Sequence, residues 1–189
     1  MKTWKQSTFI GIITLVTLCT FVACATTGSS PSRVSVGNIN ALVGGRQSGP
    51  PPTNELAKVA ISQSAFTNTG LAELSGYQGY GAWSSPTRVF GVMQDVDQIG
   101  LYYSGLGHAE YDELQKKINA AVNTEDIRYR DNADGSYDYF ANHNSGKNAV
   151  SMRFFSRASG SWKEGDILVF FYSAPWDFTT PSFQSETYK

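Results

Sequence analysis

Hydrophobic and polar positions change their period along this chain, and each period predicts a different kind of element. Over residues 108–123 the apolar residues return every three or four positions, which is the spacing of one face of an α-helix. Asp112 and Glu113 each precede a lysine by four positions, a pairing that stabilises helices. The residues of the apolar face are Tyr111, Leu114, Ile118, Ala121 and Val122. We therefore predict an amphipathic helix over residues 108–123.

After this helix the period falls to two, which is typical of strands with one buried face. Residues 125–143 alternate in this way around Asp134-Gly135, a pair that favours the positive φ angles of a tight turn. The segments "NAVSMRFFSR" and "DILVFFYSA" follow, joined by a turn-rich stretch. We predict two β-hairpins, over residues 125–143 and 148–174.

The chain before the helix gives weaker patterns. "NELAKVAISQSAF" (54–66) predicts a helix, although its second half is equally compatible with a strand. "GLAELSGYQGYGAWSSP" (70–86) is dense in glycine and predicts an irregular loop. "TRVFGVMQDV" (87–96) and "QIGLYYSG" (98–105) predict strands from their β-branched and aromatic content.

Together these elements predict an α+β domain. We expect a mostly antiparallel sheet of about four to six strands with one amphipathic helix packed on it. Folds of this kind serve many unrelated functions, so no activity follows from the fold class.

The chain begins with a basic, then apolar segment. Lys2 and Lys5 precede an uncharged run over residues 9–23. A helix needs about 20 apolar residues to cross the hydrocarbon core of a bilayer, so this run is short for a permanent span. A basic start, a short apolar core and small residues at its end are typical of a secretory signal peptide. We predict a signal peptide over residues 1–23.

A cysteine stands where the apolar run ends, in "FVACATTGSS". Val22 and Ala23 before Cys24 give this segment a form that resembles the lipobox of bacterial lipoproteins, with Phe21 departing from the usual leucine. The resemblance implies cleavage before Cys24, a diacylglyceryl thioether on its sulfur, and acylation (palmitate being a typical chain) of the new amino terminus. It also implies a membrane-anchored protein of the bacterial cell envelope, either periplasmic or surface-exposed.

The alternative is cleavage by the general signal peptidase after "ACA", with Ala23 and Ala25 in the small-residue positions. That cleavage would leave a soluble secreted protein starting at Thr26. The neighbours of the cysteine and the polar tract behind it favour lipidation. This tract is poor in large apolar residues, so we predict a lipidated cysteine with a flexible tether over residues 24–52 and a single domain over residues 53–189.

Charge and cysteine content narrow the classes of partner. Without Lys2 and Lys5, 13 of the 15 basic residues remain against 16 acidic ones, a formal charge of −3 without a basic patch. This argues against nucleic acid as a partner. Membrane association is then expected through the lipid. Cys19 leaves with the signal peptide, so the mature chain keeps one cysteine and we expect no internal disulfide.

Local motifs for catalysis, cofactors and metals are incomplete. Gly105 and Gly107 stand where a dinucleotide-binding loop would begin, but Glu110 occupies the place of the third glycine. The chain has no HExxH motif and no paired cysteines, so we predict no metal site and no cofactor. If the protein is an envelope hydrolase, the candidate residues are His108 and Glu110 together with Asp95 and Asp97.

Aromatic residues are the one excess in the composition. Tyr77, Tyr80 and Trp83 recur every third position in a glycine-rich stretch, where they could stack on a sugar or anchor a protein partner. The alternative is that they close the ends of the sheet core. Three hypotheses for the function therefore remain: a binding or structural envelope protein, a module that binds glycan or another small ligand, and an envelope hydrolase.

Overall fold

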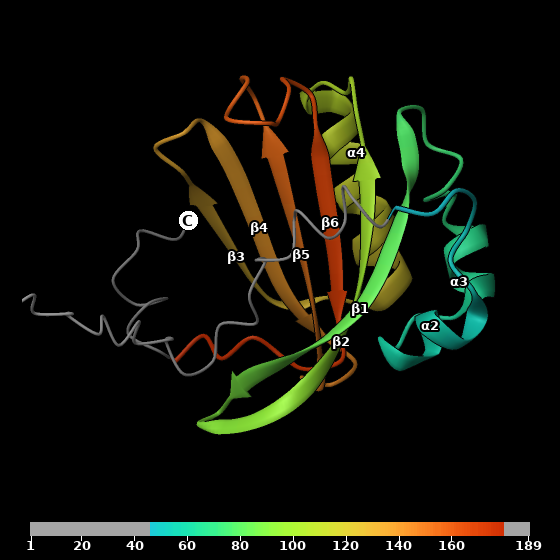
Figure 1. Ribbon diagram of the computed structural model, residues 1–189, viewed down its shortest axis with the longest axis vertical. Helices are drawn as coiled ribbons and strands as arrows, with labels where there is room; N and C mark the ends of the chain where they lie inside the picture. Colours follow the sequence, from blue (N-terminus) through green and yellow to red (C-terminus); the bar gives the residue numbers. More distant parts are fainter. Residues whose placement is uncertain (1–45, 180–189) are drawn as a thin grey trace, which may run out of the picture.

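The computed structural model describes residues 46–179, so the predicted signal peptide, Cys24 and the tether up to residue 45 lie outside the described residues. Six antiparallel strands form one sheet in the order β1-β2-β6-β5-β4-β3 (Figure 1). The strands are β1 (Tyr77–Val89), β2 (Val92–Tyr103), β3 (Glu125–Asp131), β4 (Ser136–His143), β5 (Asn148–Phe155) and β6 (Ile167–Tyr172). The helices of the described part are α2 (Thr53–Lys58), α3 (Gln63–Asn68) and α4 (His108–Val122).

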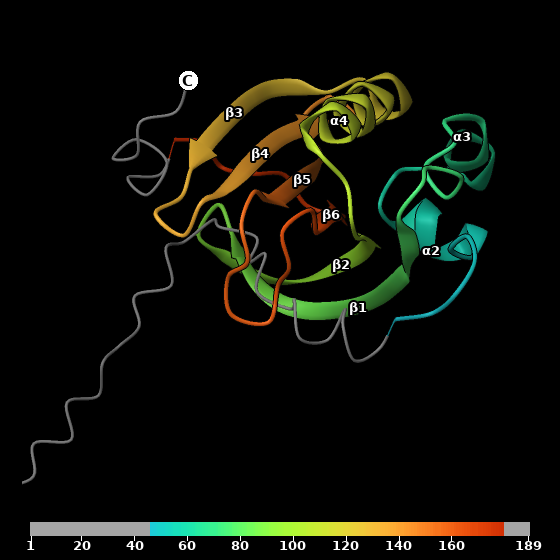
Figure 2. The same cartoon turned by 90° about the horizontal axis from the view of Figure 1, so that it is seen from above.

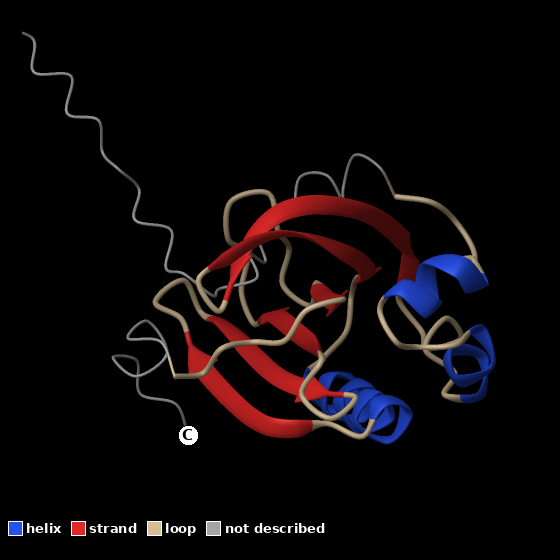
Figure 3. Cartoon of the chain, turned by 90° about the horizontal axis from the view of Figure 1, so that it is seen from below, coloured by secondary structure: helices blue, strands red, loops and turns tan. Residues whose placement is uncertain are grey.

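The sheet is strongly curved, and its concave side holds the helices (Figure 2). Strands β3 to β6 follow one another as hairpins, while β2 pairs with β6 and carries β1 at the edge. The chain leaves β2, which is next to the edge strand β1, and reaches the opposite edge at β3 through α4. Figure 3 shows the same arrangement from below, with α4 and the pair α2 and α3 inside the curve.

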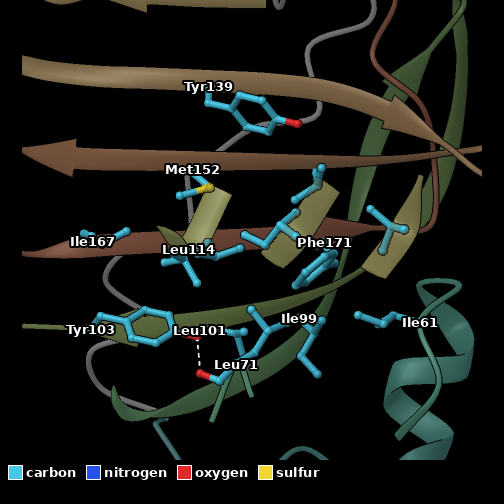
Figure 4. Packing of buried hydrophobic residues seen from close by; sticks show 14 of the residues in the cluster. Ile61, Leu71, Ile99, Leu101, Tyr103, Leu114, Tyr139, Met152, Ile167 and Phe171 are labelled. Atoms are coloured by element: carbon cyan, nitrogen blue, oxygen red, sulfur yellow. Dashed lines mark hydrogen bonds between the residues drawn. The ribbon is translucent and has the colours of Figure 1, made fainter. Parts of the chain in front are cut away.

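The inner face of the sheet and the three helices enclose the larger core (Figure 4). α4 contributes its apolar face to this core, with Leu114 and Ile118 fully buried. On the sheet side, Tyr103 donates a hydrogen bond from its hydroxyl to the carbonyl of Leu71 at 2.6 Å, which fixes the segment after α3. The sheet residues of this core include Ile99, Leu101, Tyr139, Val150, Met152, Ile167, Val169 and Phe171.

The outer face of the sheet carries a second, aromatic core that loops cover. Trp162, from the loop between β5 and β6, stacks on Phe155 with ring centroids 5.3 Å apart. Trp176, in the segment after β6, packs edge-on against Phe140 at 5.2 Å. Asn142 on β4 fastens this segment, because its side chain exchanges two hydrogen bonds with the backbone of Trp176, at 2.7 and 3.0 Å.

A buried carboxylate lies on the same outer face. Asp138 is 2% exposed and accepts hydrogen bonds from two arginines, Arg130 on β3 and Arg153 on β5. The three side chains lie side by side on the neighbouring strands β3, β4 and β5, because Asp138 is the cross-strand partner of both arginines. This cluster ties the edge of the sheet to its centre.

The prediction from sequence is confirmed for the antiparallel sheet and for both hairpins of the second half. The helix predicted over residues 108–123 is present as α4, and Asn123 ends it in a left-handed conformation with φ 51°. The prediction of one helix on the sheet is confirmed in part, since α2 and α3 add to it. At the β3–β4 turn Gly135 has a φ of 80° but Asp134 is not left-handed; instead its carboxylate accepts from Ser136.

Three local predictions are wrong. Residues 70–86 were expected to form an irregular loop, but β1 begins at Tyr77. The strand predicted over residues 87–96 is interrupted by the hairpin turn at Phe90-Gly91. The helix predicted over residues 54–66 is divided, because Ala60 takes a φ of 59° between α2 and α3.

The first described residues belong to the segment that was predicted to be the tether. Residues 46–52, assigned to the tether, run beside the edge strand β1. Gln47 and Tyr80 exchange backbone hydrogen bonds at 2.5 and 2.9 Å. Gly79 permits this approach, since a Cβ at its position would collide with the carbonyl of Gln47. We call residues 46–52 the strap.

Candidate functional site

The three aromatic residues predicted to bind a ligand lie on strand β1, on two different faces. Tyr77 and Tyr80 pack against the inner core, and Tyr80 is itself buried. Trp83 points to the outer face, where its ring meets Phe170 edge-on at 5.9 Å. The structure therefore does not bring these three rings together as one stacking platform.

Both tyrosine hydroxyls bind the strap. Tyr80 donates a hydrogen bond to Oε1 of Gln47 at 2.8 Å, and Tyr77 donates one to the carbonyl of Gly49 at 2.7 Å. Burial, and to a lesser degree the neighbouring Tyr80, raises the pKa of Tyr77 to about 12, so its hydroxyl stays protonated as a donor. These bonds hold the strap at a fixed distance from the sheet.

The strap, α2 and β1 together border a groove of about 370 Å³. Its lining residues are Gln47, Pro52, Glu55, Lys58, Tyr80, Ala82, Trp83, Ser84 and Asp97. One of the predicted ligand-binding residues, Tyr80, thus lines the same groove as one of the predicted acids, Asp97; Trp83 borders the groove, although its ring packs on the outer face. A volume near 400 Å³ is within the usual range of small-molecule sites. We call this the β1 groove.

Asp97 is the polar centre of the β1 groove. It is half-buried, and its Oδ1 accepts a hydrogen bond from the hydroxyl of Ser84, its cross-strand partner. Its backbone is held from the other side, because its N–H donates to the hydroxyl of Ser173 at 2.8 Å. Across the groove α2 presents Glu55 and Lys58, whose charged ends are 3.6 Å apart. The groove thus offers carboxylate acceptors and one ammonium donor around apolar and aromatic surface.

The indole nitrogen of Trp83 is a further unusual donor. It is buried and has no hydrogen-bond partner, and the side-chain carbonyl of Gln98, its cross-strand neighbour on β2, is an equally unpartnered acceptor. An unpaired buried polar group costs free energy, on the order of 1–3 kcal/mol.

The candidate catalytic residues are dispersed. His108 is at the start of α4 and packs on Phe154 at 4.8 Å, at the end of the sheet where β2 reaches Tyr103. Asp97 lies six residues before Tyr103, which is about 20 Å along the strand, and Asp95 is farther still. Glu110 accepts from the backbone N–H of Gly107 at 2.9 Å and so caps α4. The structure does not bring His108 together with Asp95 or Asp97.

The described residues give no metal centre and no spanning helix. Between residues 46 and 179 no group of three or more His, Cys, Asp and Glu side chains is placed to hold a metal ion. Over the same range no helix is both long and apolar enough to cross a membrane.

Comparisons with protein-family models, with curated proteins and with solved structures found no match to this chain. Sequence reasoning singled out Tyr80, Trp83 and Asp97 but missed Gln47, Glu55 and Lys58. No local signal could have found these three, because they reach the groove through the fold of the strap and α2.

Proposed function

We propose that this protein is a lipid-anchored binding protein of the bacterial cell envelope, and that its β1 groove holds a small ligand rich in hydroxyl groups. Cys24 would be the attachment to lipid, and the residues behind it would tether the domain to the membrane. The observation that carries the proposal is that Tyr80, Asp97, Glu55 and Lys58 line one groove of about 370 Å³.

The chemistry of the groove favours a saccharide over an apolar or strongly charged ligand. Carboxylates such as those of Asp97 and Glu55 accept hydrogen bonds from sugar hydroxyls, while Lys58 can donate to them. Tyr80 and Ala82 supply the apolar surface that the less polar faces of a sugar ring prefer. The mixed charge of the lining favours neither a multiply charged anion nor a cation.

Replacing Asp97 tests the groove. We expect Asp97→Asn to weaken binding of an N-acetylglucosamine trimer about tenfold, because a charged acceptor is lost while the shape is kept. The matched control is Asp95→Asn, two positions away on the same face of β2 but exposed and outside the groove. Isothermal titration calorimetry measures both dissociation constants. Equal losses in the two variants, or no saturable binding by the unmodified protein, would contradict the saccharide proposal.

Replacing Cys24 tests the anchor. We expect Cys24→Ser to move the protein from the membrane fraction to the soluble fraction and to abolish labelling by a fatty-acid analogue, because serine has no thiol to alkylate. The control is Cys19→Ser, since Cys19 lies inside the predicted signal peptide and should leave both readouts unchanged. Unchanged partitioning of Cys24→Ser would show that the membrane attachment is not at this residue.

A further inference from the structure

The β1–β2 hairpin ends in an exposed apolar tip. Phe90 and Gly91 form the two-residue turn between the paired residues Val89 and Val92. Phe90, Val92 and Met93 are 59%, 65% and 54% exposed. Of the four large exposed hydrophobic residues in the described part of the chain, three are therefore at this turn. We call Phe90, Val92 and Met93 the hairpin tip.

The backbone of the tip is unfavourable for the residue that occupies it. Phe90 has a φ of 46° and Gly91 a φ of 82°. A two-residue turn with both φ angles positive favours Asn-Gly or Asp-Gly, and a bulky side chain in this region is an outlier. Such local strain persists where function retains it. Neither turn preference nor burial explains a phenylalanine at this position.

Arg88 places a positive charge directly behind the apolar tip. Arg88, the cross-strand partner of Met93, donates a hydrogen bond from Nη1 to the carbonyl of Gly91 at 3.2 Å. Between residues 88 and 94 it is the one ionisable residue, and the nearest acid along β2 is Asp95. An arginine at the base of an apolar tip can place its charge among lipid headgroups while the apolar side chains go deeper.

We propose that the hairpin tip inserts into the interfacial layer of a lipid bilayer. The hairpin that carries the tip extends beyond the rest of the sheet (Figure 1), so the tip can reach into a soft surface before the rest of the sheet touches it. Three apolar side chains give weak binding by themselves, and stable attachment to a membrane usually takes two signals. The tip supplies the second contact beside the lipid on Cys24, which rests on the proposed anchor.

Insertion depends on apolar contact more than on lipid charge. The crevice beside Phe90, of about 400 Å³, is lined by Arg128 but also by Asp126 and Asp177. The charges around the tip thus include both signs, and the formal charge of the chain without residues 1–23 is −3. Phosphatidylcholine vesicles should therefore bind the tip about as well as vesicles that contain phosphatidylglycerol.

The test separates the tip from the lipid anchor. A chain that starts at residue 25 carries an amino-terminal hexahistidine tag and is bound to phosphatidylcholine vesicles through a nickel-chelating lipid, so Cys24 is not needed. Val92→Cys then provides the one thiol for an environment-sensitive fluorophore. We expect its emission to rise about twofold and shift to the blue on vesicle binding. The matched control is Lys116→Cys, exposed on α4, which lies away from the hairpin end in Figure 1 and should show no shift.

A second variant tests the contribution of Phe90 itself. Phe90→Asn puts the residue that this turn prefers at position 90, so we expect a higher midpoint of thermal unfolding together with about half of the fluorophore response. An unchanged response in Phe90→Asn, or equal responses at positions 92 and 116, would overturn the proposal. A blue shift that grows with protein concentration in the absence of vesicles would overturn it in favour of a contact between copies of this chain.

Discussion

Replacing Asp138 with asparagine is expected to lower the free energy of unfolding by about 3 kcal/mol or more, the largest effect of any single substitution considered for this domain. Asp138 accepts from Nη2 of Arg130 at 2.5 Å and from Nε and Nη2 of Arg153 at 2.6 and 2.8 Å. Asparagine removes the negative charge and leaves two mostly buried guanidinium groups facing each other across β4. The cost combines several lost charge-assisted hydrogen bonds with the repulsion between two neighbouring positive charges that Asp138 no longer offsets.

The same cluster predicts a dependence on acid. Burial is the largest single influence on Asp138 and raises its pKa, but the hydrogen bonds and charge of Arg153, together with the hydrogen bonds of Arg130 and Asn132, outweigh it and hold the pKa below its usual value. A carboxyl whose pKa is lower in the folded than in the unfolded state stabilises the fold above the unfolded pKa. We therefore expect this contribution to be lost as the pH falls from about 4 through the folded pKa of Asp138.

Urea unfolding at pH 7 measures the effect of Asp138→Asn. The matched control is Asp112→Asn on the exposed face of α4, which should change the free energy of unfolding by less than about 0.5 kcal/mol. The Asp138→Asn variant should also show less acid destabilisation below pH 4 than the unmodified protein. A loss no larger than that of the control would mean that the two arginines find other compensation in the folded chain.

The predictable part of this fold is the part with strong periodicity. The apolar face of α4 follows directly from burial on one side, and β5 and β6 are almost continuous apolar runs because both faces of the sheet are covered, so these elements could be recognised without tertiary information. Strand β1 could not, because its Gly79 and Gly81 have no side chains to show an alternation. The strand forms there because β2 pairs along its whole length and the strap passes close beside Gly79.

The candidate sites, too, could be predicted only in part from the sequence. Tyr80, Trp83 and Asp97 could be singled out one by one as residues suited to ligand binding, but the β1 groove depends on Gln47, which is 33 positions from Tyr80. The hairpin tip was missed because Phe90-Gly91 is not a usual turn pair, so the stretch around it resembled one strand. A phenylalanine rarely occupies a turn position with a positive φ. This is why the turn could not be recognised from the sequence, and it is also why Phe90 is unusual in the structure.

His143 is expected to make the fold sensitive to mild acid. It is at the end of β4, 1% exposed, and its Nε2 has no hydrogen-bond partner. Burial lowers its pKa to about 4, although a hydrogen bond with the backbone of Ala149 acts in the opposite direction. In the unfolded chain a histidine titrates near pH 6.5. Between these two values the unfolded state binds the additional proton, so stability is complete above about pH 6.5 and is lost as the pH falls toward 4.

The loss due to His143 between pH 7 and pH 5 should be roughly 2 kcal/mol. Urea unfolding at the two pH values measures it, and His143→Gln should remove most of this difference, whatever it does to stability at pH 7. The matched control is His108→Gln, which replaces the other histidine of the chain, an exposed one, and should keep the difference of the unmodified protein. Because carboxylates on the protein titrate mainly below pH 5, the interval isolates the histidines. If His143→Gln kept the full difference, the buried imidazole would have to be protonated in the folded state already at pH 5.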